Sequence, residues 1–176
     1  SNQFSVQSAI GQGTNNYTVS QLNRYVAAVA NKGTVYKLTL LDKTTDANGK
    51  RIKQYEPEVV STMDYVSDET WNLIHQGMQL MVQGSSSFTG LEISMAGKTG
   101  TAQQSDVHAD HALFVGFAPV EEPEIAVAVR IANGYFSNYP ADIAGDIVKA
   151  YFNLVPKEEL VTGHAKEVQT FTVRGD

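Results

Sequence analysis

The stretch Ile93-Ser94-Met95-Ala96-Gly97-Lys98-Thr99-Gly100-Thr101-Ala102-Gln103 sets how this chain folds and what it binds. In an extended conformation it presents a lysine, threonine hydroxyls and small glycines at one place. A ligand that carries a carboxylate and lies against a strand edge requires this set, because it needs a positive charge, hydroxyl donors and a backbone that it can approach closely. We therefore predict a binding strand here, supported by the rest of the chain.

Gly97-Lys98-Thr99 also occurs at the end of phosphate-binding loops. Such a loop requires a glycine, four further residues and then Gly-Lys-Ser/Thr before a helix. Glu92 stands where the first glycine is required, and residues 101–104 begin no apolar helical pattern. A nucleotide site is thus excluded on spacing, and we expect no cofactor.

A helix is predicted before the first strand-like segment. Thr18 and Gln21 have the spacing of a capping box, and Asn31-Lys32-Gly33 supplies a stop signal, so we expect a helix over residues 19–31. Its core-facing residues are expected to be Leu22, Tyr25, Val26, Val29 and Ala30.

Residues 34–41 are rich in β-branched and aromatic side chains, which predicts a short strand. Asn48-Gly49 lies at the tip of a predicted hairpin turn over residues 46–50, and residues 51–55 form the returning strand. The hairpin is locally basic through Lys43, Lys50, Arg51 and Lys53, which we interpret as a solvated flap.

Ser67 is the predicted N-cap of a second helix, which ends at Gly84. Its buried stripe is expected to be Trp71, Ile74, Met78, Met81 and Val82. His75 has no partner at a metal-binding or catalytic spacing, so we expect it to be structural or to face solvent. Residues 84–90, with three consecutive serines, are interpreted as a polar linker, because no lysine or histidine follows at an activating spacing.

After residues 93–103 we expect a turn over residues 104–110, strands over residues 111–118 and 124–132, and a last helix from residues 138–140 to Pro156. The last helix is expected to bury Ile143, Ile147, Val148, Tyr151 and Phe152. The fold class is therefore α+β, with an antiparallel meander packed against helices.

Composition excludes several functional classes. The net charge of −6 and the sequence pI of about 5.1 argue against a nucleic-acid partner, because such partners are bound by clustered Lys and Arg. The chain has no cysteine, which rules out disulfides and Cys-based zinc sites. His108, Asp110 and His111 are metal ligands by type but lack further ligands at a recognisable spacing, so we expect no metal. No apolar stretch is long enough to span a membrane.

Several blocks, in this order, resemble the transpeptidase domain of class B penicillin-binding proteins. They cover roughly residues 8 to 154, which makes them more specific than Lys-Thr-Gly alone. The blocks are Ile10-Gly11-Gln12-Gly13, Thr18-Val19-Ser20-Gln21-Leu22, residues 28–36, residues 97–103, residues 111–119 and residues 125–129.

The resemblance implies roles for the residues of the motif strand. Lys98 would supply positive charge to the substrate carboxylate, and the Thr99 hydroxyl would contact the same group. Gly100 would let the backbone approach the ligand. Thr101 would donate its backbone N–H to the oxyanion hole and pair with the substrate as an added strand, and Gln103 would lie among the substrate contacts.

The family's other catalytic motifs, Ser-x-x-Lys and Ser-x-Asn, are absent from the sequence. We therefore expect residues 1–155 to be the C-terminal part of the transpeptidase domain, without nucleophile or base, and residues 156–176 to be a tail. The parent protein would cross-link peptidoglycan stem peptides ending in D-Ala-D-Ala, and β-lactams would acylate it. It would act on the extracytoplasmic face of the bacterial membrane, anchored by a segment outside this chain, together with other cell-wall synthesis proteins. The isolated chain is expected to be inactive.

Two alternatives share the strand motif. A serine β-lactamase or β-lactam sensor domain also contains Lys-Thr-Gly, although residues 10–13 and 18–22 resemble the transpeptidases. A non-catalytic module could use the same strand edge to hold peptides.

Overall fold

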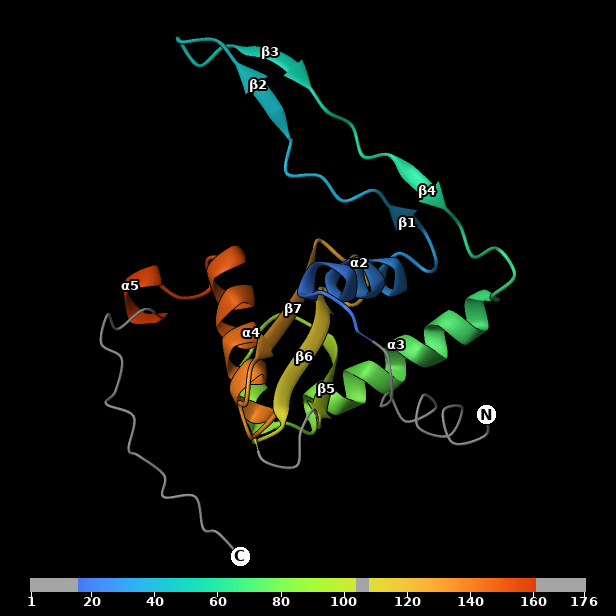
Figure 1. Cartoon of the computed structure of the whole chain (residues 1–176), viewed down its shortest axis with the longest axis vertical. Helices are drawn as coiled ribbons and strands as arrows, with labels where there is room; N and C mark the ends of the chain where they lie inside the picture. The colour runs from blue at the N-terminus through green and yellow to red at the C-terminus, as the bar shows by residue number, and fades with distance from the viewer. Residues whose placement is uncertain (1–15, 104–107, 161–176) are drawn as a thin grey trace, which may run out of the picture.

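The computed structural model describes residues 16–103 and 108–160 (Figure 1). At its centre is an antiparallel sheet with the strand order β5-β6-β7. The strands are β5 (Ala96–Ala102), β6 (His111–Ala118) and β7 (Ile125–Ile131), each paired with the next in the chain. The predicted meander is confirmed, and the edge position of β5 leaves its outer side without a strand partner among the described residues.

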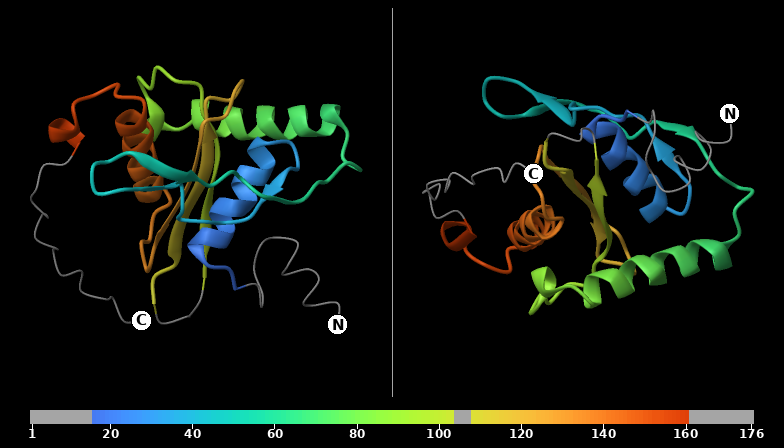
Figure 2. Two further views of the ribbon diagram at one scale, coloured as in Figure 1. Left: turned by 90° about the horizontal axis from the view of Figure 1, so that it is seen from above. Right: turned by 60° about the horizontal axis from the view of Figure 1, so that its bottom comes forward.

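Helices cover both faces of this sheet (Figure 2). One face packs against α2 (Val19–Ala30) and the other against α4 (Asn138–Tyr151). Helix α3 (Asp68–Gln83) reaches both layers, because Trp71 belongs to the α2-side core and Val82 to the α4-side core. The large side chains at the centre of the two cores are Phe117 and Phe114 of β6.

The two predicted N-caps are present. The Gln21 backbone N–H donates to the Thr18 hydroxyl at 3.2 Å, and the Thr18 backbone N–H donates to the Gln21 side chain at 2.8 Å. The Ser67 hydroxyl accepts from the Thr70 backbone N–H at the start of α3. Local side-chain chemistry thus sets where both helices begin.

The predicted buried faces of α2 and α3 are partly wrong. Tyr25 and Ile74 are exposed, whereas Val26 and Trp71 are buried as expected. His75 is buried, and its Nε2 lies 2.8 Å from the carbonyl oxygen of Val29. Its ring packs on Phe117, with centroids 4.8 Å apart, so the structural role that the sequence allowed is the observed one.

The predicted face of α4 is partly wrong, although Val148 is buried and Phe152 packs against the core as expected. Ile143, Ile147 and Tyr151 are exposed, while a face of small residues packs inward. The buried residues of α4 are Pro140, Ala141, Ala144, Gly145 and Val148. The large rings of Phe114 and Phe88 already occupy the core on this side, so the helix approaches the sheet through residues with little volume.

The serine-rich segment is more than a linker. Residues Ser86–Phe88 form the 3-10 helix η1, and Phe88 packs against Phe114 with ring centroids 5.3 Å apart. After Pro156 the chain forms one further short helix, α5 (Lys157–Leu160). The segments before Asn16, between Gln103 and His108, and after Leu160 lie outside the described residues, and so do the predictions made for them.

A long ribbon, residues 35–61, projects away from the sheet and helices (Figures 1 and 2). We call it the arm. Near the body β1 (Val35–Tyr36) pairs with β4 (Val59–Ser61), and further out β2 (Lys43–Thr45) pairs with β3 (Arg51–Gln54). The predicted strand over residues 34–41 is only partly confirmed, because β1 ends at Tyr36 and residues 37–42 are exposed between the two strand pairs.

The predicted hairpin turn at the end of the arm is confirmed. The Asp46 carboxylate accepts hydrogen bonds from the backbone N–H groups of Asn48 and Lys50, each at 2.9 Å. Gly49 has φ of +80°, a conformation that favours glycine. Among the described residues, no helix combines the length and the apolar character that crossing a bilayer requires.

Candidate functional site

The side chains of β5 are distributed over the two faces of the sheet. Residues directly opposite each other in an antiparallel pair share a face, and Lys98 lies opposite Val115. Val115 packs against the core that contains α2 and Trp71, so Lys98 is on the α2 side. Thr99 lies opposite Phe114 and Thr101 opposite Ala112, which places both threonines on the α4 side.

Lys98 is exposed, and its ammonium donates to the carbonyl oxygen of Thr99 at 2.9 Å. Within the described part of the chain no carboxylate pairs with it. Its positive charge is therefore available to an anionic ligand at the strand edge. Thr101 is exposed on the same strand. Gln103, the first residue after the strand, is also exposed.

The two glycines of the motif have different surroundings. A Cβ at Gly97 would lie 2.8 Å from Cε2 of Phe114 and closer still to Cζ, so the core requires glycine there. A Cβ at Gly100 would meet only the Cβ of Leu113, at 3.5 Å, which is an ordinary contact. Neither glycine has a positive φ. Packing explains Gly97 and leaves Gly100 without a structural reason among the described residues.

A hydrogen-bonded link fixes the segment that leads into β5. The Ser94 hydroxyl accepts from the backbone N–H of Val120 at 2.9 Å and donates to the carboxylate of Glu121. The bond from Ser94, with one from the backbone of Glu121, lowers the pKa of this exposed carboxyl from its ordinary value. The loop between β6 and β7 thereby holds the start of the motif strand.

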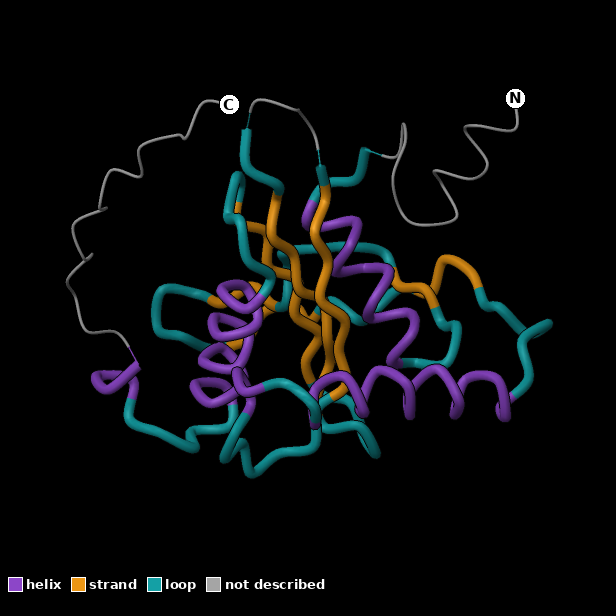
Figure 3. The backbone as a smooth tube through the Cα atoms, turned by 90° about the horizontal axis from the view of Figure 1, so that it is seen from below, coloured by secondary structure: helices purple, strands orange, loops and turns teal. Residues whose placement is uncertain are grey.

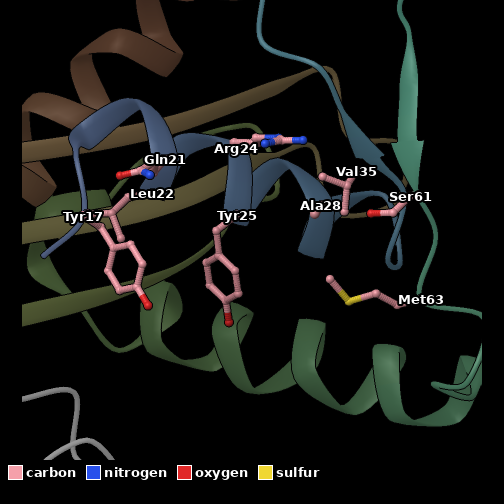
Figure 4. Close-up of a pocket in the computed structure, with 9 residues that line it drawn as sticks. All are labelled: Tyr17, Gln21, Leu22, Arg24, Tyr25, Ala28, Val35, Ser61 and Met63. Atoms are coloured by element: carbon pink, nitrogen blue, oxygen red, sulfur yellow. The ribbon is translucent and has the colours of Figure 1, made fainter. Parts of the chain in front are cut away.

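Sequence reasoning missed a pocket of about 590 Å³ between α2 and the base of the arm (Figure 4). Tyr17, just before α2, and Tyr25 on α2 extend their side chains toward the same side, and Val35 and Met63 line the opposite end. The signal was present in the sequence, because Gln21, Tyr25 and Ala28 follow one another at helical spacing. This spacing indicates a second face on α2, away from the sheet.

His111, a metal ligand by type, has a structural contact instead. Its Nδ1 accepts a hydrogen bond from the backbone N–H of Asn133 at 3.0 Å, which ties the start of β6 to the end of β7. In the part of the chain that the structure describes, no group of three or more His, Cys, Asp or Glu residues is arranged to hold a metal ion.

Comparisons with known proteins identify the family of this chain. The family described as "Penicillin binding protein transpeptidase domain" matches residues 1–153. Penicillin-binding protein 2B of Streptococcus pneumoniae is 31% identical over 167 residues, covering 83% of this chain and 24% of the relative. The peptidoglycan D,D-transpeptidase MrdA of Acinetobacter baumannii is 32% identical over 155 residues, covering 77% of this chain and 22% of the relative. The chain thus spans about a quarter of the length of the curated relatives it matches.

Solved structures show the same fold. The structure of penicillin-binding protein 2B from S. pneumoniae strain R6 superimposes with a TM-score of 0.76 at 29% identity, covering 89% of this chain and 28% of that one. Penicillin-binding protein A of M. tuberculosis, solved as an imipenem acyl-enzyme complex, gives a TM-score of 0.74 at 23% identity over 83% of this chain and 33% of that one, which supports the fold alone. With a family match across most of its length, the chain belongs to the penicillin-binding protein transpeptidase family, and its relatives are class B members.

Proposed function

We propose that this chain forms one wall of the substrate cleft of a peptidoglycan D,D-transpeptidase. In this proposal the outer edge of β5, from Lys98 to Thr101, holds the extended end of a D-Ala-D-Ala stem peptide, and β-lactams bind at the same place. The substrate would add to the sheet as a further strand, with main-chain hydrogen bonds to β5.

The contrast between the two motif glycines is the observation that carries this proposal. Gly97 is needed by the core, whereas the space beside Gly100 is open to a methyl group as far as the described residues are concerned. A ligand lying against the strand would supply the missing reason, because a side chain at position 100 would then obstruct it.

Each remaining motif residue has a chemical part in the proposal. The ammonium of Lys98 attracts the substrate carboxylate, and the hydroxyl of Thr99 donates a hydrogen bond to it. The backbone N–H of Thr101 donates to the oxyanion that forms when a nucleophile attacks the carbonyl carbon. Gln103 contacts the peptide beyond the reacting bond.

The serine nucleophile and the lysine that takes its proton are absent from residues 1–176, so we propose that they belong to a longer protein and that the isolated chain is catalytically incompetent. Lys98 and α2 lie on the same side of the sheet, so we place the nucleophile on that side. By analogy with its relatives, the longer protein would work at the extracytoplasmic face of the membrane with other cell-wall synthesis proteins.

Labelling with a fluorescent penicillin tests the proposal in two proteins, the 176-residue chain and the longer polypeptide encoded upstream of Ser1. We expect covalent labelling of the longer protein only. In that protein Gly100→Ala should slow labelling about 100-fold, as expected when a reacting group is displaced by about 1 Å. Gly77→Ala is the matched control, because Gly77 lies on α3 and a Cβ added there would have no neighbouring atom within 4 Å.

Two results would overturn the proposal. A stable adduct on the 176-residue chain would show that a nucleophile is present here after all. Equal labelling rates for Gly100→Ala and Gly77→Ala would show that no ligand lies against the β5 edge.

A further inference from the structure

The arm has the length of an interface and packs on nothing along most of that length. It runs from Val35 to Ser61, and Figure 1 shows it extending away from the body. A specific protein interface uses about 20–30 residues from each partner. An isolated two-stranded ribbon is only marginally stable in water, so a partner that covers the arm would stabilise it.

The middle of the arm, between the two strand pairs and along β4, is apolar and exposed. Leu40 has no contact that shields it and is fully exposed, and its apolar neighbours on both strands of the ribbon are each more than half exposed. These neighbours are Leu38, Leu41, Val59 and Val60. Several large apolar side chains exposed within one short segment favour an association site there.

Charge changes sign along the arm. Residues 43–54, at the tip, contain four basic side chains and one acidic one. Residues 55–69, which lead back to the body and into α3, contain five acidic side chains and no basic one. In the described structure no carboxylate pairs with Lys50, Arg51 or Lys53, so the tip is an uncompensated positive surface.

We infer that two copies of this chain associate through their arms, side by side and antiparallel. A two-fold axis through the apolar middle places the basic tip of each arm against residues 55–69 of the other. The apolar centres then cover each other, and opposite charges meet at both ends. One sequence thus supplies both halves of a self-complementary surface, which is what a two-fold interface requires.

Analytical ultracentrifugation of the 176-residue chain measures this association. We expect a monomer–dimer equilibrium that weakens as salt is raised, because exposed charges are screened beyond about 10 Å at 0.1 M ionic strength. Leu40→Asp should remove the dimer without unfolding the chain, since Leu40 packs on nothing.

Charge reversal provides the sharper test. The tip variant is Arg51→Glu with Lys53→Glu, and the base variant is Glu56→Lys with Asp64→Lys. The base variant leaves Glu58 in place, because that carboxylate already pairs with Lys37 of the same arm at 2.8 Å. Each variant alone should weaken self-association about tenfold or more, because it reverses or greatly reduces the charge on one of the two facing surfaces. The tip variant changes residues 43–54 from a net charge of +3 to −1, and the base variant changes residues 55–69 from −5 to −1.

A mixture of the tip and base variants should form the heterodimer. In the mixed pair the unchanged basic tip of the base variant meets the unchanged acidic residues 55–69 of the tip variant, so one end keeps the attraction of the parent dimer. Neither variant homodimer keeps that attraction at either end. Glu158→Lys with Glu159→Lys on α5 is the control and should leave association unchanged.

A chain that stays monomeric at all concentrations would overturn the inference. The arm would then have to bind a partner other than a second copy of this chain. The inference would also be overturned if neither charge reversal weakened the dimer, or if the mixture of variants associated no more strongly than either variant alone. These outcomes are independent of penicillin labelling, so failure of this inference leaves the proposed function untouched.

Discussion

The ring of Phe114 occupies the space that a side chain at Gly97 would need. Both residues lie on the α4 face of the sheet, where Phe114 is fully buried and also contacts Phe88. The glycine therefore lets a large aromatic side chain of this core sit under the motif strand. The first glycine of the motif serves the fold, and we propose that the second serves the ligand.

We predict that Gly97→Ala destabilises the chain by about 1–3 kcal/mol, because the added methyl group overpacks the core against Phe114. Gly100→Ala should change stability by less than about 0.5 kcal/mol, since its methyl group makes an ordinary contact with Leu113. Urea denaturation of both variants measures the difference. Equal losses would contradict the assignment of separate roles to the two glycines.

Thr18→Ala should destabilise the chain by about 1 kcal/mol. The substitution removes the acceptor for the Gln21 backbone N–H at the first turn of α2. Thr18→Ser keeps an equivalent hydroxyl and should retain most of the stability. Thermal unfolding of the Thr18→Ala and Thr18→Ser variants measures the difference in stability. An alanine variant as stable as the serine variant would show that the capping box contributes nothing.

His75 should contribute through one hydrogen bond and through its ring. His75→Phe keeps an aromatic ring against Phe117 but loses the bond to the Val29 carbonyl, which should cost about 1 kcal/mol. His75→Ala also leaves a cavity and should cost about 3 kcal/mol. If both variants unfolded at the same urea concentration as the parent chain, the bridge between α2 and α3 would not be stabilising.

The Glu121 carboxyl should titrate below the ordinary range for glutamate, and NMR measurement of its pKa checks this. The Ser94 hydroxyl is the main cause, because it donates to the ionised form. A folded-state pKa below the unfolded-state value gives stability that is present above the unfolded-state pKa and is lost as pH falls through the folded-state pKa.

Ser94→Ala should raise the Glu121 pKa toward its ordinary value, whereas Ser94→Thr should keep it low. Since the carboxyl is exposed, the associated change in stability is expected to be small. A pKa that is the same in the alanine and threonine variants would show that Ser94 does not set it.

Local patterns predicted the elements well. The capping box at Thr18, the Ser67 cap and the turn around Gly49 depend on side chains within a few residues of the backbone they contact. The meander followed from the nearly continuous apolar runs of β6 and β7, which come after the motif strand and are separated by turns. The family followed from ordered blocks that no single motif could have supplied.

Burial was harder to predict where two faces of a helix are both apolar. On α4, Ile143 and Ile147 compete with Ala141 and Ala144, and hydrophobicity alone favours the isoleucines. The choice depends on Phe88 and Phe114, which come from distant parts of the sequence and leave room only for small residues. Tyr25 was misplaced for a similar reason, because it faces the pocket on α2 and not the sheet.

The arm shows a third limit of local reasoning. Its alternating pattern predicts strands, but nothing in residues 34–41 indicates whether a sheet or solvent lies beside them. The motif strand differs, because Lys98 and Gly100 could be assigned to an exposed edge from their chemistry alone. The pairing of Lys98 with Val115, which fixes the side of the sheet, required the structure.

Backbone amide NMR can show whether β5, the edge strand of the central sheet drawn in orange in Figure 3, binds a peptide. The 176-residue chain is titrated with a peptide ending in D-Ala-D-Ala, alongside the Lys98→Ala variant. We expect the amide shifts to concentrate at residues 98–103 and to be lost in the variant. Shifts confined to the α2 pocket around Tyr17 and Tyr25, or shifts at β5 that persist without the lysine, would contradict a peptide-binding role for this strand.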